Sequence, residues 1–414
     1  MPINLNPRCR FCRAPLSITL VDLGSTPLAN SYIAPDQLGD PEPTFPLHAR
    51  LCSICRLVQV DDVAAPEKIF GHYAYFSSYS ASWVEHARRF AVLAKERWRL
   101  DEKSLVVEVA SNDGYLLRHF VGMSVPVLGI EPAANVAEAA RAAGVATDVA
   151  FFGRATAERL CSQGRMADLI VGNNVFAHVP DINDFVAGFA MLLKPDGVVS
   201  LEFPHVLKLI EQTQFDTIYH EHFSYLSLYT TEKIFAAHGL KVFDVTELPT
   251  HGGSLRVMAS LAASRGYGQS EGLAKVRRDE ASAGIDSDAL YSGFESKVQA
   301  VRTAFVDFLN SAKADGKTVV AYGAAAKGNT LLNYCGVGTD FIDYVVDLNP
   351  HKQGCFLPGS RLPIYSPRRL SETRPDYVLI LPWNLQDEIM AQTSYIREWG
   401  GQFVVAVPRL TILP

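Results

Sequence analysis

The apolar and polar positions of this chain repeat as a short buried run, a small turn and an amphipathic stretch. The first repeat is the run Leu105–Val109, the turn Ala110–Gly114 and a helix that begins near Tyr115. Apolar runs of this length followed by helices are typical of an open parallel sheet. A helix is expected over residues 83–99. Further strands are expected to end at Glu131, to lie near residues 145–153 and to end at Asn173. After a helix over 182–193 and a turn over 194–197, another strand is expected to end at residue 203.

Polar side chains follow these predicted strands at their carboxyl ends, where doubly wound folds bind nucleotides. Glu131 is placed to accept hydrogen bonds from ribose hydroxyls, although a strand-end acid can also simply face solvent. The first turn, EVASNDGY, lacks both G-x-G-x-x-G and G-x-x-x-x-G-K-[ST], so a cofactor without a phosphate to cradle fits better. S-adenosylmethionine is such a cofactor, and its candidate contacts are Asp113, Gly114, Glu131, Asn173 and Asn174.

Two strands joined by a turn are expected over residues 240–261, an antiparallel pair of the kind that closes many methyltransferase sheets. From about residue 263 the sequence is charged and helical, and then a second series of strand, glycine-rich turn and helix begins at residue 317. The turn GAAAKG places Lys327 and free backbone N–H groups at a helix start, which suits an anionic diphosphate. Such a turn can also serve only helix–strand packing. We take Lys327 and Asn329 as candidate substrate-binding residues.

Four of the seven cysteines form two C-x2-C pairs in short, loop-rich sequence. Two such pairs supply four thiolates to one tetrahedral zinc ion, and a site filled by protein ligands leaves no position for water. The zinc is therefore expected to stabilise a small domain without taking part in chemistry. Unrelated free or redox-active pairs are the alternative, and disulfides are disfavoured in a reducing cytosol. The expected ligands are Cys9, Cys12, Cys52 and Cys55.

Composition narrows the possible functions further. The chain has 414 residues, is 48% hydrophobic, and carries 38 basic against 44 acidic residues, a net charge of −6. With no basic block, a nucleic-acid partner is not expected. The sequence has no apolar run of the roughly 18 to 20 residues that span a bilayer and no signal-peptide pattern at its start, so a cytoplasmic protein is expected.

The stretch YHEHFSY, residues 219–225, places two histidines and a glutamate among aromatic side chains. Groups that titrate near neutral pH cost free energy when buried unless they are paired, which points to a chemical role. The spacing is too tight for the helical zinc motif H-E-x-x-H. Histidines beside aromatic residues are also often core residues with satisfied ring nitrogens, and the stretch alone does not exclude that reading.

Several motifs in this order carry a family resemblance: the two C-x2-C pairs with VDLGSTPLANSY between them, EVASNDGYLL, NNVFAHVPD, YHEHFSY, THGGSLRV and AYGAAAKGNTLLN. Nearly the whole chain resembles the three-domain nucleotide-sugar C-methyltransferases of deoxysugar biosynthesis, including those of the tetronitrose pathway. The resemblance implies an α/β fold with an N-terminal zinc ribbon (1–70), an S-adenosylmethionine-dependent Rossmann-like methyltransferase domain (71–263) and a second, C-terminal Rossmann-like domain that binds the nucleotide sugar (264–414).

The resemblance also implies a reaction, methyl transfer to C-3 of a dTDP-linked 4-keto-deoxysugar. The ketone acidifies the C-3 hydrogen, a base removes it, and the resulting enolate carbon takes the methyl group. By resemblance His222 is the base, Glu221 its orienting or charge-balancing partner, and Tyr219 an alternative base or an enolate donor. Two further active-site positions, His178 and Tyr73, match the family pattern.

Two alternatives remain at the level of sequence. The C-terminal turn AYGAAAKG with Asp347 after the next strand suggests an NAD-dependent oxidoreductase, although a full G-x-G-x-x-G is missing. The other alternative is a zinc-ribbon interaction protein without activity. The sequence does not determine the sugar's substituents, the stereochemistry at C-3, the choice between His222 and Tyr219 as base, or whether the protein is a monomer or a small homo-oligomer.

Overall fold

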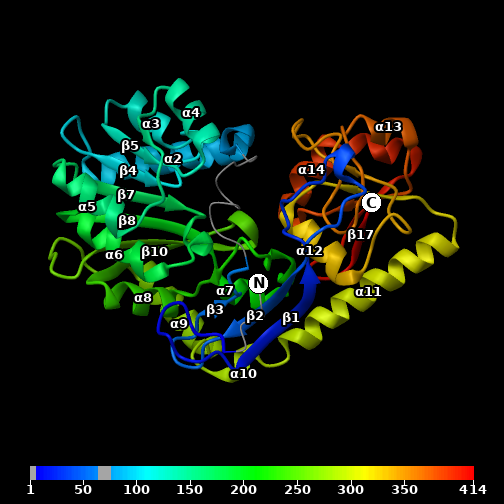
Figure 1. Cartoon of the computed structure of the whole chain (residues 1–414), viewed down its shortest axis with the longest axis horizontal. Coiled ribbons are helices and arrows are strands. Elements are labelled where there is room, and N and C mark those ends of the chain that lie inside the picture. The colour runs from blue at the N-terminus through cyan, green and yellow to red at the C-terminus, as the bar shows by residue number, and fades with distance from the viewer. Residues whose placement is uncertain (1–5, 64–75) are drawn as a thin grey trace.

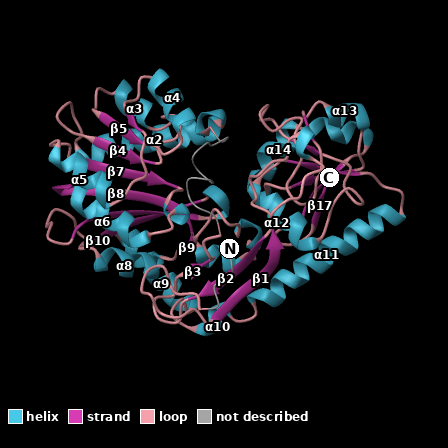
Figure 2. Ribbon diagram, in the orientation of Figure 1, coloured by secondary structure: helices cyan, strands magenta, loops and turns pink. Residues whose placement is uncertain are grey.

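The computed structural model describes residues 6–63 and 76–414. Two α/β lobes stand on either side of a small N-terminal sheet, and the long helix α11 (Phe294–Ala314) runs beneath the second lobe (Figure 1). Each lobe has its own sheet, with helices around it (Figure 2). This arrangement is the mixed α/β fold expected from the sequence.

The first lobe is a seven-stranded sheet with the order β10-β11-β8-β7-β4-β5-β6. Strands β4 to β8 are parallel, and β11 and β10 close one edge in antiparallel orientation, which confirms the strand pair expected over 240–261. Its strands are β4 (Val106–Val109), β5 (Val127–Ile130), β6 (Thr147–Asp148), β7 (Ala167–Asn173), β8 (Leu193–Pro204), β10 (Leu240–Leu248) and β11 (Ser254–Leu261).

The helices of this lobe include α2, whose N-cap Ser80 accepts a hydrogen bond from the N–H of Trp83, a typical start signal. Hydrophobic residues of α6 face the sheet, and Asp181 caps its first turn. The helices are α2 (Ala81–Trp98), α3 (Leu117–Gly122), α4 (Ala134–Ala142), α5 (Arg154–Ser162), α6 (Ile182–Leu192), α7 (Val206–Glu211), α8 (Leu228–Ala237) and α9 (Glu271–Ala283), with short 3-10 turns η2 (Ser77–Tyr79), η3 (Phe176–His178), η4 (Phe215–Thr217) and η5 (Thr250–Gly252).

Two expected boundaries are wrong. The helix expected near Tyr115 begins at Leu117, after a turn that includes three left-handed residues. The turn expected over 194–197 is part of β8, because Leu193 already pairs with Ala167 of the neighbouring strand. A Cβ at Gly197 would lie 2.8 Å from the carbonyl oxygen of Ala167, so this irregular start of β8 requires glycine.

The N-terminal sheet is antiparallel and contains a strand from far along the chain. Its order is β1-β2-β3-β9, and the last strand directly follows the YHEHFSY histidines. Val58 pairs with Tyr225, so this sheet fixes where the histidine segment lies. The strands are β1 (Ile18–Thr26), β2 (Phe45–Leu51), β3 (Val58–Gln59) and β9 (Ser224–Tyr225), and a 3-10 turn η1 spans Pro35–Gln37.

The second lobe has a six-stranded sheet with the order β14-β13-β12-β15-β16-β17, parallel except at β17. The strand expected from residue 317 is β12, and the next expected strand, which precedes Asp347, is β13. The strands are β12 (Val319–Tyr322), β13 (Val345–Val346), β14 (Ile364–Tyr365), β15 (Tyr377–Ile380), β16 (Gln402–Val405) and β17 (Thr411–Leu413), and the helices are α10 (Asp288–Tyr291), α11, α12 (Ala326–Cys335), α13 (Arg369–Thr373), α14 (Gln386–Gln392), η6 (Trp383–Leu385) and η7 (Ser394–Trp399).

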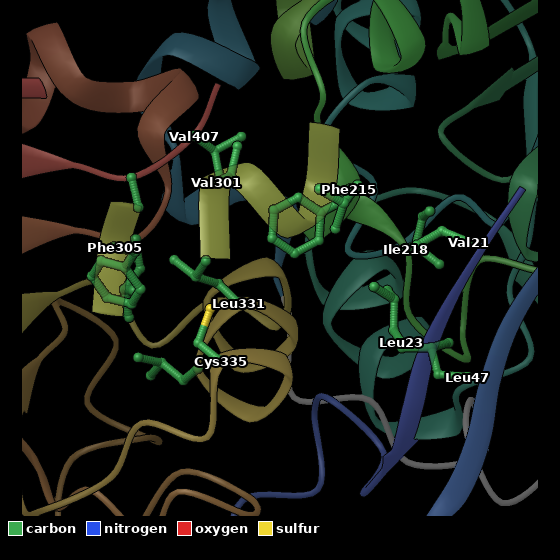
Figure 3. Packing of buried hydrophobic residues seen from close by; sticks show 14 of the residues in the cluster. Val21, Leu23, Leu47, Phe215, Ile218, Val301, Phe305, Leu331, Cys335 and Val407 are labelled. Atoms are coloured by element: carbon green, nitrogen blue, oxygen red, sulfur yellow. The ribbon is translucent and has the colours of Figure 1, made fainter. Parts of the chain in front are cut away.

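One hydrophobic core joins the N-terminal sheet to the second lobe. Leu23 and Leu47 of that sheet, Phe215 and Ile218 of the first lobe, and Leu331 of α12 belong to the same cluster of buried side chains (Figure 3). The segment just before YHEHFSY therefore packs between two parts of the chain that are distant in sequence. Burial of such large side chains typically contributes about 1.5 to 3 kcal/mol each, so this segment is firmly positioned.

Candidate active site

The four cysteine thiols of the N-terminal region converge. Their sulfur atoms all lie within 4.8 Å of one another, with 3.5 Å between Sγ of Cys9 and Cys55 and 3.5 Å between Sγ of Cys12 and Cys52. Three of the four are buried. Four convergent thiols fit the closed tetrahedral coordination of structural zinc, as the sequence predicts.

Arg10, between the first two cysteines, connects this cluster to the histidines. Its guanidinium donates to the carbonyl of Pro180 at 2.8 Å and to that of Val60 at 2.6 Å, and it lies 5.2 Å from the centre of the Phe223 ring. Pro180 is two residues after His178, and Phe223 directly follows His222. Through Arg10 the zinc-binding region thus contacts both the segment of His178 and the segment of His222.

The turn after β4 lies at the edge of the sheet where the sequence predicts the cofactor. Its backbone is left-handed at Ala110, Asn112 and Gly114, with φ values of 54°, 50° and 77°. The carboxylate of Glu131 accepts the N–H of Asn112 at 2.9 Å and that of Ala133 at 2.9 Å. A Cβ at Gly114 would lie 2.9 Å from the Val145 side chain, so glycine is needed both for its φ and for space.

Three of the predicted cofactor contacts have buried acceptor atoms without a partner in the described structure. Among the described residues, Oδ1 of Asp113, of Asn173 and of Asn174 has no hydrogen-bond partner although each is buried. Buried polar atoms are rarely left unpaired in folded proteins. These acceptors follow β4 and β7, and their chemistry fits the ammonium and hydroxyl donors of S-adenosylmethionine. Burial raises the pKa of Glu131, and a ligand donor would favour its charged form.

The segment before α2 covers the same turn. The N–H of Ser77 donates to Oδ1 of Asn112 at 2.8 Å, and the N–H of Ser78 donates to Oδ2 of Asp113 at 3.0 Å. Trp83 of α2 then stacks on Tyr115, with ring centres 6.0 Å apart. The turn after β4 therefore has the backbone of Ser77 and Ser78 on one side and the rings of Trp83 and Tyr115 on the other.

His222 has a defined tautomer. Its Nδ1 lies 3.0 Å from the carbonyl oxygen of Thr217, which can only accept, so Nδ1 carries the proton. Burial, and then the neighbouring His178, lower the pKa of His222 well below its usual value, so the ring is neutral at pH 7. Nε2 is therefore a free base, and it accepts a 2.6 Å hydrogen bond from the Tyr219 hydroxyl.

His178 is fixed in the same way. Its Nδ1 donates to the carbonyl of Glu221 at 2.7 Å, and its ring meets that of His222 edge-on at 4.6 Å between centres. Burial lowers the pKa of His178 to about 4. Two neutral imidazoles thus face each other where η3 meets the YHEHFSY segment.

The orienting role expected for the Glu221 side chain is wrong. Its Oε1 accepts from the N–H and from the side-chain amide of Asn30, each at 3.3 Å, and the carbonyl of Thr217 orients His222 instead. Glu221 points toward the N-terminal region because its neighbours are paired into that sheet. His220, the other histidine of the stretch, is buried and lies 3.2 Å from the carbonyl of Pro46.

Lys327 and Asn329 both lie on α12 of the second lobe, and their surroundings differ. The positive charge of Lys327 acts on both His222 and His251. The side-chain amide of Asn329 donates to the carbonyl of Ala29 at 2.6 Å and so joins α12 to the N-terminal region. Tyr73 lies outside the described residues.

Sequence reasoning missed His251. It has a left-handed backbone, with φ of 55°, and meets the ring of Trp83 edge-on at 5.5 Å between centres. Burial, followed by the charge of Lys327, lowers its pKa to about 4. The available signal was the motif THGG, in which two glycines follow the histidine and permit the tight turn.

Three family models match the chain in succession. A zinc binding domain matches residues 9–70, a methyltransferase domain matches residues 83–245, and a C-methyltransferase C-terminal domain matches residues 249–408. No helix among residues 6–63 and 76–414 is long and apolar enough to cross a bilayer.

A relative matches over nearly the full length. The chain is 38% identical to the C-methyltransferase NovU of Streptomyces niveus over 98% of this chain and 96% of the relative. A ubiquinone biosynthesis O-methyltransferase of Bartonella bacilliformis is 28% identical over 23% of this chain and 38% of its own length. Among solved structures, an S-adenosylmethionine-dependent methyltransferase from Clostridium acetobutylicum has a TM-score of 0.35 at 12% identity, covering 44% of this chain and 92% of its own.

Proposed function

Since the chain belongs to the C-methyltransferase family, we propose that it transfers a methyl group from S-adenosylmethionine to C-3 of a dTDP-linked 4-keto-deoxysugar. The observation that carries this proposal is the neutral His222 with Nε2 bonded to the Tyr219 hydroxyl. A base that is uncharged at pH 7 suits removal of a proton from carbon. The choice of carbon over oxygen as the methylated atom rests on the family, because a base of this kind can also take a proton from a hydroxyl.

In the proposed reaction, removal of the C-3 proton converts the ketone into an enolate. The C-3–H bond breaks, its electron pair forms the C-3–C-4 double bond, and the carbonyl π pair moves to the C-4 oxygen. The cofactor supplies an electrophilic methyl group, which C-3 takes while the sulfur keeps the bonding pair. Glu131, Asp113 and the amide oxygens of Asn173 and Asn174 are the proposed contacts that hold the cofactor.

The Tyr219–His222 hydrogen bond defines how the base works in this proposal. Nε2 is occupied by the phenol, so a proton from C-3 reaches it through the hydroxyl: the phenol oxygen takes the C-3 proton as its own proton passes to Nε2. The carbonyl of Thr217, which accepts the hydrogen bond from Nδ1–H, stabilises the positive charge that forms on the His222 ring. Tyr219 and His222 are therefore proposed to act as one base.

The oxidoreductase alternative gains no support from the glycine-rich turn of the second lobe. The carboxylate of Asp347 already accepts the N–H of Ala324 at 2.7 Å and that of Asn349 at 2.8 Å. The hydroxyl of Tyr32, from the N-terminal region, donates to the carbonyl of Ala324 at 2.6 Å. The model of the C-methyltransferase C-terminal domain, which matches residues 249–408, spans this turn and favours methyl transfer over the oxidoreductase alternative.

Methyl transfer can be tested with isotope-labelled cofactor. The purified protein is incubated with S-adenosylmethionine carrying a ¹³C methyl group and with dTDP-4-keto-2,6-dideoxy sugars, and the product is analysed by NMR. The proposal predicts a ¹³C methyl bonded to C-3 and no transfer to the matching 4-hydroxy sugar, whose C-3 hydrogen is not acidic. A labelled O-methyl product, or equal transfer to the 4-hydroxy sugar, would reject the proposal.

A further inference from the structure

The first turns of α12 are fixed on the segment that holds His222. The hydroxyl of Thr330 donates to the carbonyl of Ile218 at 3.0 Å. The adjacent carbonyl, that of Thr217, accepts the bond from Nδ1 of His222. Lys327, one turn before Thr330 on the same helix, is thereby held at the histidine site by a short chain of direct contacts.

The ammonium of Lys327 lies in a polar and aromatic setting. It donates to Oδ1 of Asn384 at 2.5 Å and lies 4.7 Å from the centre of the Trp383 ring. The indole N–H of Trp383 donates to Oδ2 of Asp216 at 2.7 Å. Asp216 is fully buried, and its charge acts on Lys327. Burial lowers the pKa of Lys327, and the charge of Asp216 opposes that shift. The hydrogen bond to Asn384 and the ring face of Trp383 also favour the protonated amine.

Trp383 also fixes the loop that carries His251. A Cβ at Gly252 would lie 2.4 Å from the Trp383 ring, so the loop and the ring are in direct contact. His251 and His222, on two different segments of the first lobe, both lie close enough to Lys327 for its charge to lower their pKa values. Trp383 contacts both Lys327 and the loop of His251, and α12 is bonded through Thr330 to the segment that carries His222.

A cation beside a catalytic base makes protonation of that base less favourable. When His222 gains a proton, its imidazolium and the Lys327 ammonium repel each other. The cost is offset only if negative charge develops beside the ammonium in the same step. In the proposed reaction that negative charge appears on the C-4 oxygen of the sugar.

We propose that Lys327 is a catalytic residue whose ammonium neutralises the charge that develops on the C-4 oxygen as the C-3 proton leaves. This inference rests on the proposed function. It assigns the Lys327 ammonium to the reacting carbonyl of the sugar, in place of the diphosphate of the nucleotide sugar. Lys327 keeps its own proton throughout, while the C-3 proton goes to the Tyr219–His222 pair. The carbonyl π electrons that move to the C-4 oxygen are held by the fixed positive charge.

The test compares Lys327→Met and Lys327→Arg with the control Lys275→Met, a change at an exposed lysine on α9 whose side chain is 54% accessible. Three quantities are measured: kcat, KM for the 4-keto sugar nucleotide, and the Kd of dTDP by calorimetry. Lys327→Met is expected to lower kcat by about 10²- to 10³-fold, as loss of an oxyanion donor does, while KM and Kd change by less than about threefold. Lys327→Arg keeps the charge and is expected to recover kcat at least about tenfold over Lys327→Met.

The pH profile supplies a second readout. Lys327 faces Asp216 of η4, His222 and His251, and His222 also faces His178 and Tyr219. Removing the lysine charge should raise the pKa of His222 and His251, so the acid limb of the kcat profile should move to higher pH. The same shift should be visible in an NMR titration of the histidines without any sugar present.

Three results would overturn the inference. A nearly unchanged kcat with a KM and a dTDP Kd raised about tenfold or more would place the ammonium on the diphosphate. An arginine variant as slow as the methionine variant would attribute the loss to packing, not charge. Histidine pKa values unaffected by Lys327→Met would show that the charge does not face His222. That NMR result does not depend on turnover, so it separates a failure here from a wild-type protein that methylates no keto sugar.

Discussion

The hydroxyl of Tyr219 donates a 2.6 Å hydrogen bond to Nε2 of His222, while Nδ1 of the same ring donates to the Thr217 carbonyl. Among the described residues, both ring nitrogens of His222 are engaged, and the group bonded to Nε2 is the Tyr219 phenol. This geometry joins the two candidate bases into one unit. It also explains why each was a plausible base on sequence grounds alone.

Zinc removal should damage the active site without the metal taking part in chemistry. Cys52→Ser should lower zinc content from one ion per chain and reduce the thermal midpoint, because metal binding and local folding are coupled. Methyl transfer should fall as well, since Arg10 connects the zinc-binding region to Pro180 and Phe223. Metal analysis, thermal unfolding and the transfer assay measure these effects.

Cys161→Ser is the matched control for the zinc variant. Its thiol lies on α5, donates to the carbonyl of Met191 and is not part of the cysteine cluster. The control should retain zinc, stability and transfer. Full zinc content in Cys52→Ser would refute the four-cysteine assignment.

Glu131→Ala should weaken binding of the cofactor. In the proposed site the buried carboxylate of Glu131 accepts hydrogen bonds from the ribose hydroxyls of the cofactor. Loss of such charge-assisted hydrogen bonds costs on the order of 1.5 to 3 kcal/mol. Calorimetry with S-adenosylhomocysteine measures the change. The exposed Glu138 on the following helix provides the control Glu138→Ala, for which no change is expected. Equal Kd values for the two variants would show that Glu131 does not contact the cofactor.

His178 should make the fold less stable in mild acid. Its folded pKa of about 4 lies below the unfolded value of about 6.5, so between these pH values the unfolded chain binds the extra proton. Stability therefore decreases as pH falls through this window, by up to about 1.4 kcal/mol per pH unit for one proton. In urea unfolding from pH 7 to 5, His178→Asn should show a shallower pH dependence than the wild type. Parallel curves for the two proteins would contradict the neutral, buried state of His178.

Periodicity predicted most of the framework. The alternation of apolar runs and helical stretches located the strands that end near Glu131 and Asn173, since local sequence determines where a buried strand ends. The spacing of the cysteines predicted a convergent cluster without any knowledge of the fold. Both features depend on residues that are close in sequence.

Contacts between distant segments were not predictable in the same way. Glu221 turns toward Asn30 because Tyr225 pairs with Val58, and nothing in YHEHFSY reveals that pairing. Lys327 was assigned to an anion site from its glycine-rich turn, yet α12 packs on the Asp216–Ile218 segment. His251 was overlooked because its neighbours come from α2 and from the second lobe. Each of these residues takes its role from a partner far along the chain.

Exchange of the C-3 hydrogen tests the central claim most directly. A dTDP-4-keto sugar is incubated in heavy water with S-adenosylhomocysteine, which fills the cofactor site but has no methyl group to transfer, and deuterium at C-3 is followed by NMR. The control is Tyr229→Phe, whose hydroxyl lies outside the site and bonds Lys233. Cofactor binding by each variant is checked by calorimetry, so that a loss of exchange reports on the base alone.

Wild type and Tyr229→Phe should exchange the C-3 hydrogen. His222→Gln and Tyr219→Phe should both slow the exchange by about 10²- to 10⁴-fold, the range that a general base contributes, because the proton reaches Nε2 only through the phenol. Exchange at the wild-type rate in Tyr219→Phe, or in His222→Gln, would contradict the claim that these two residues act as one base.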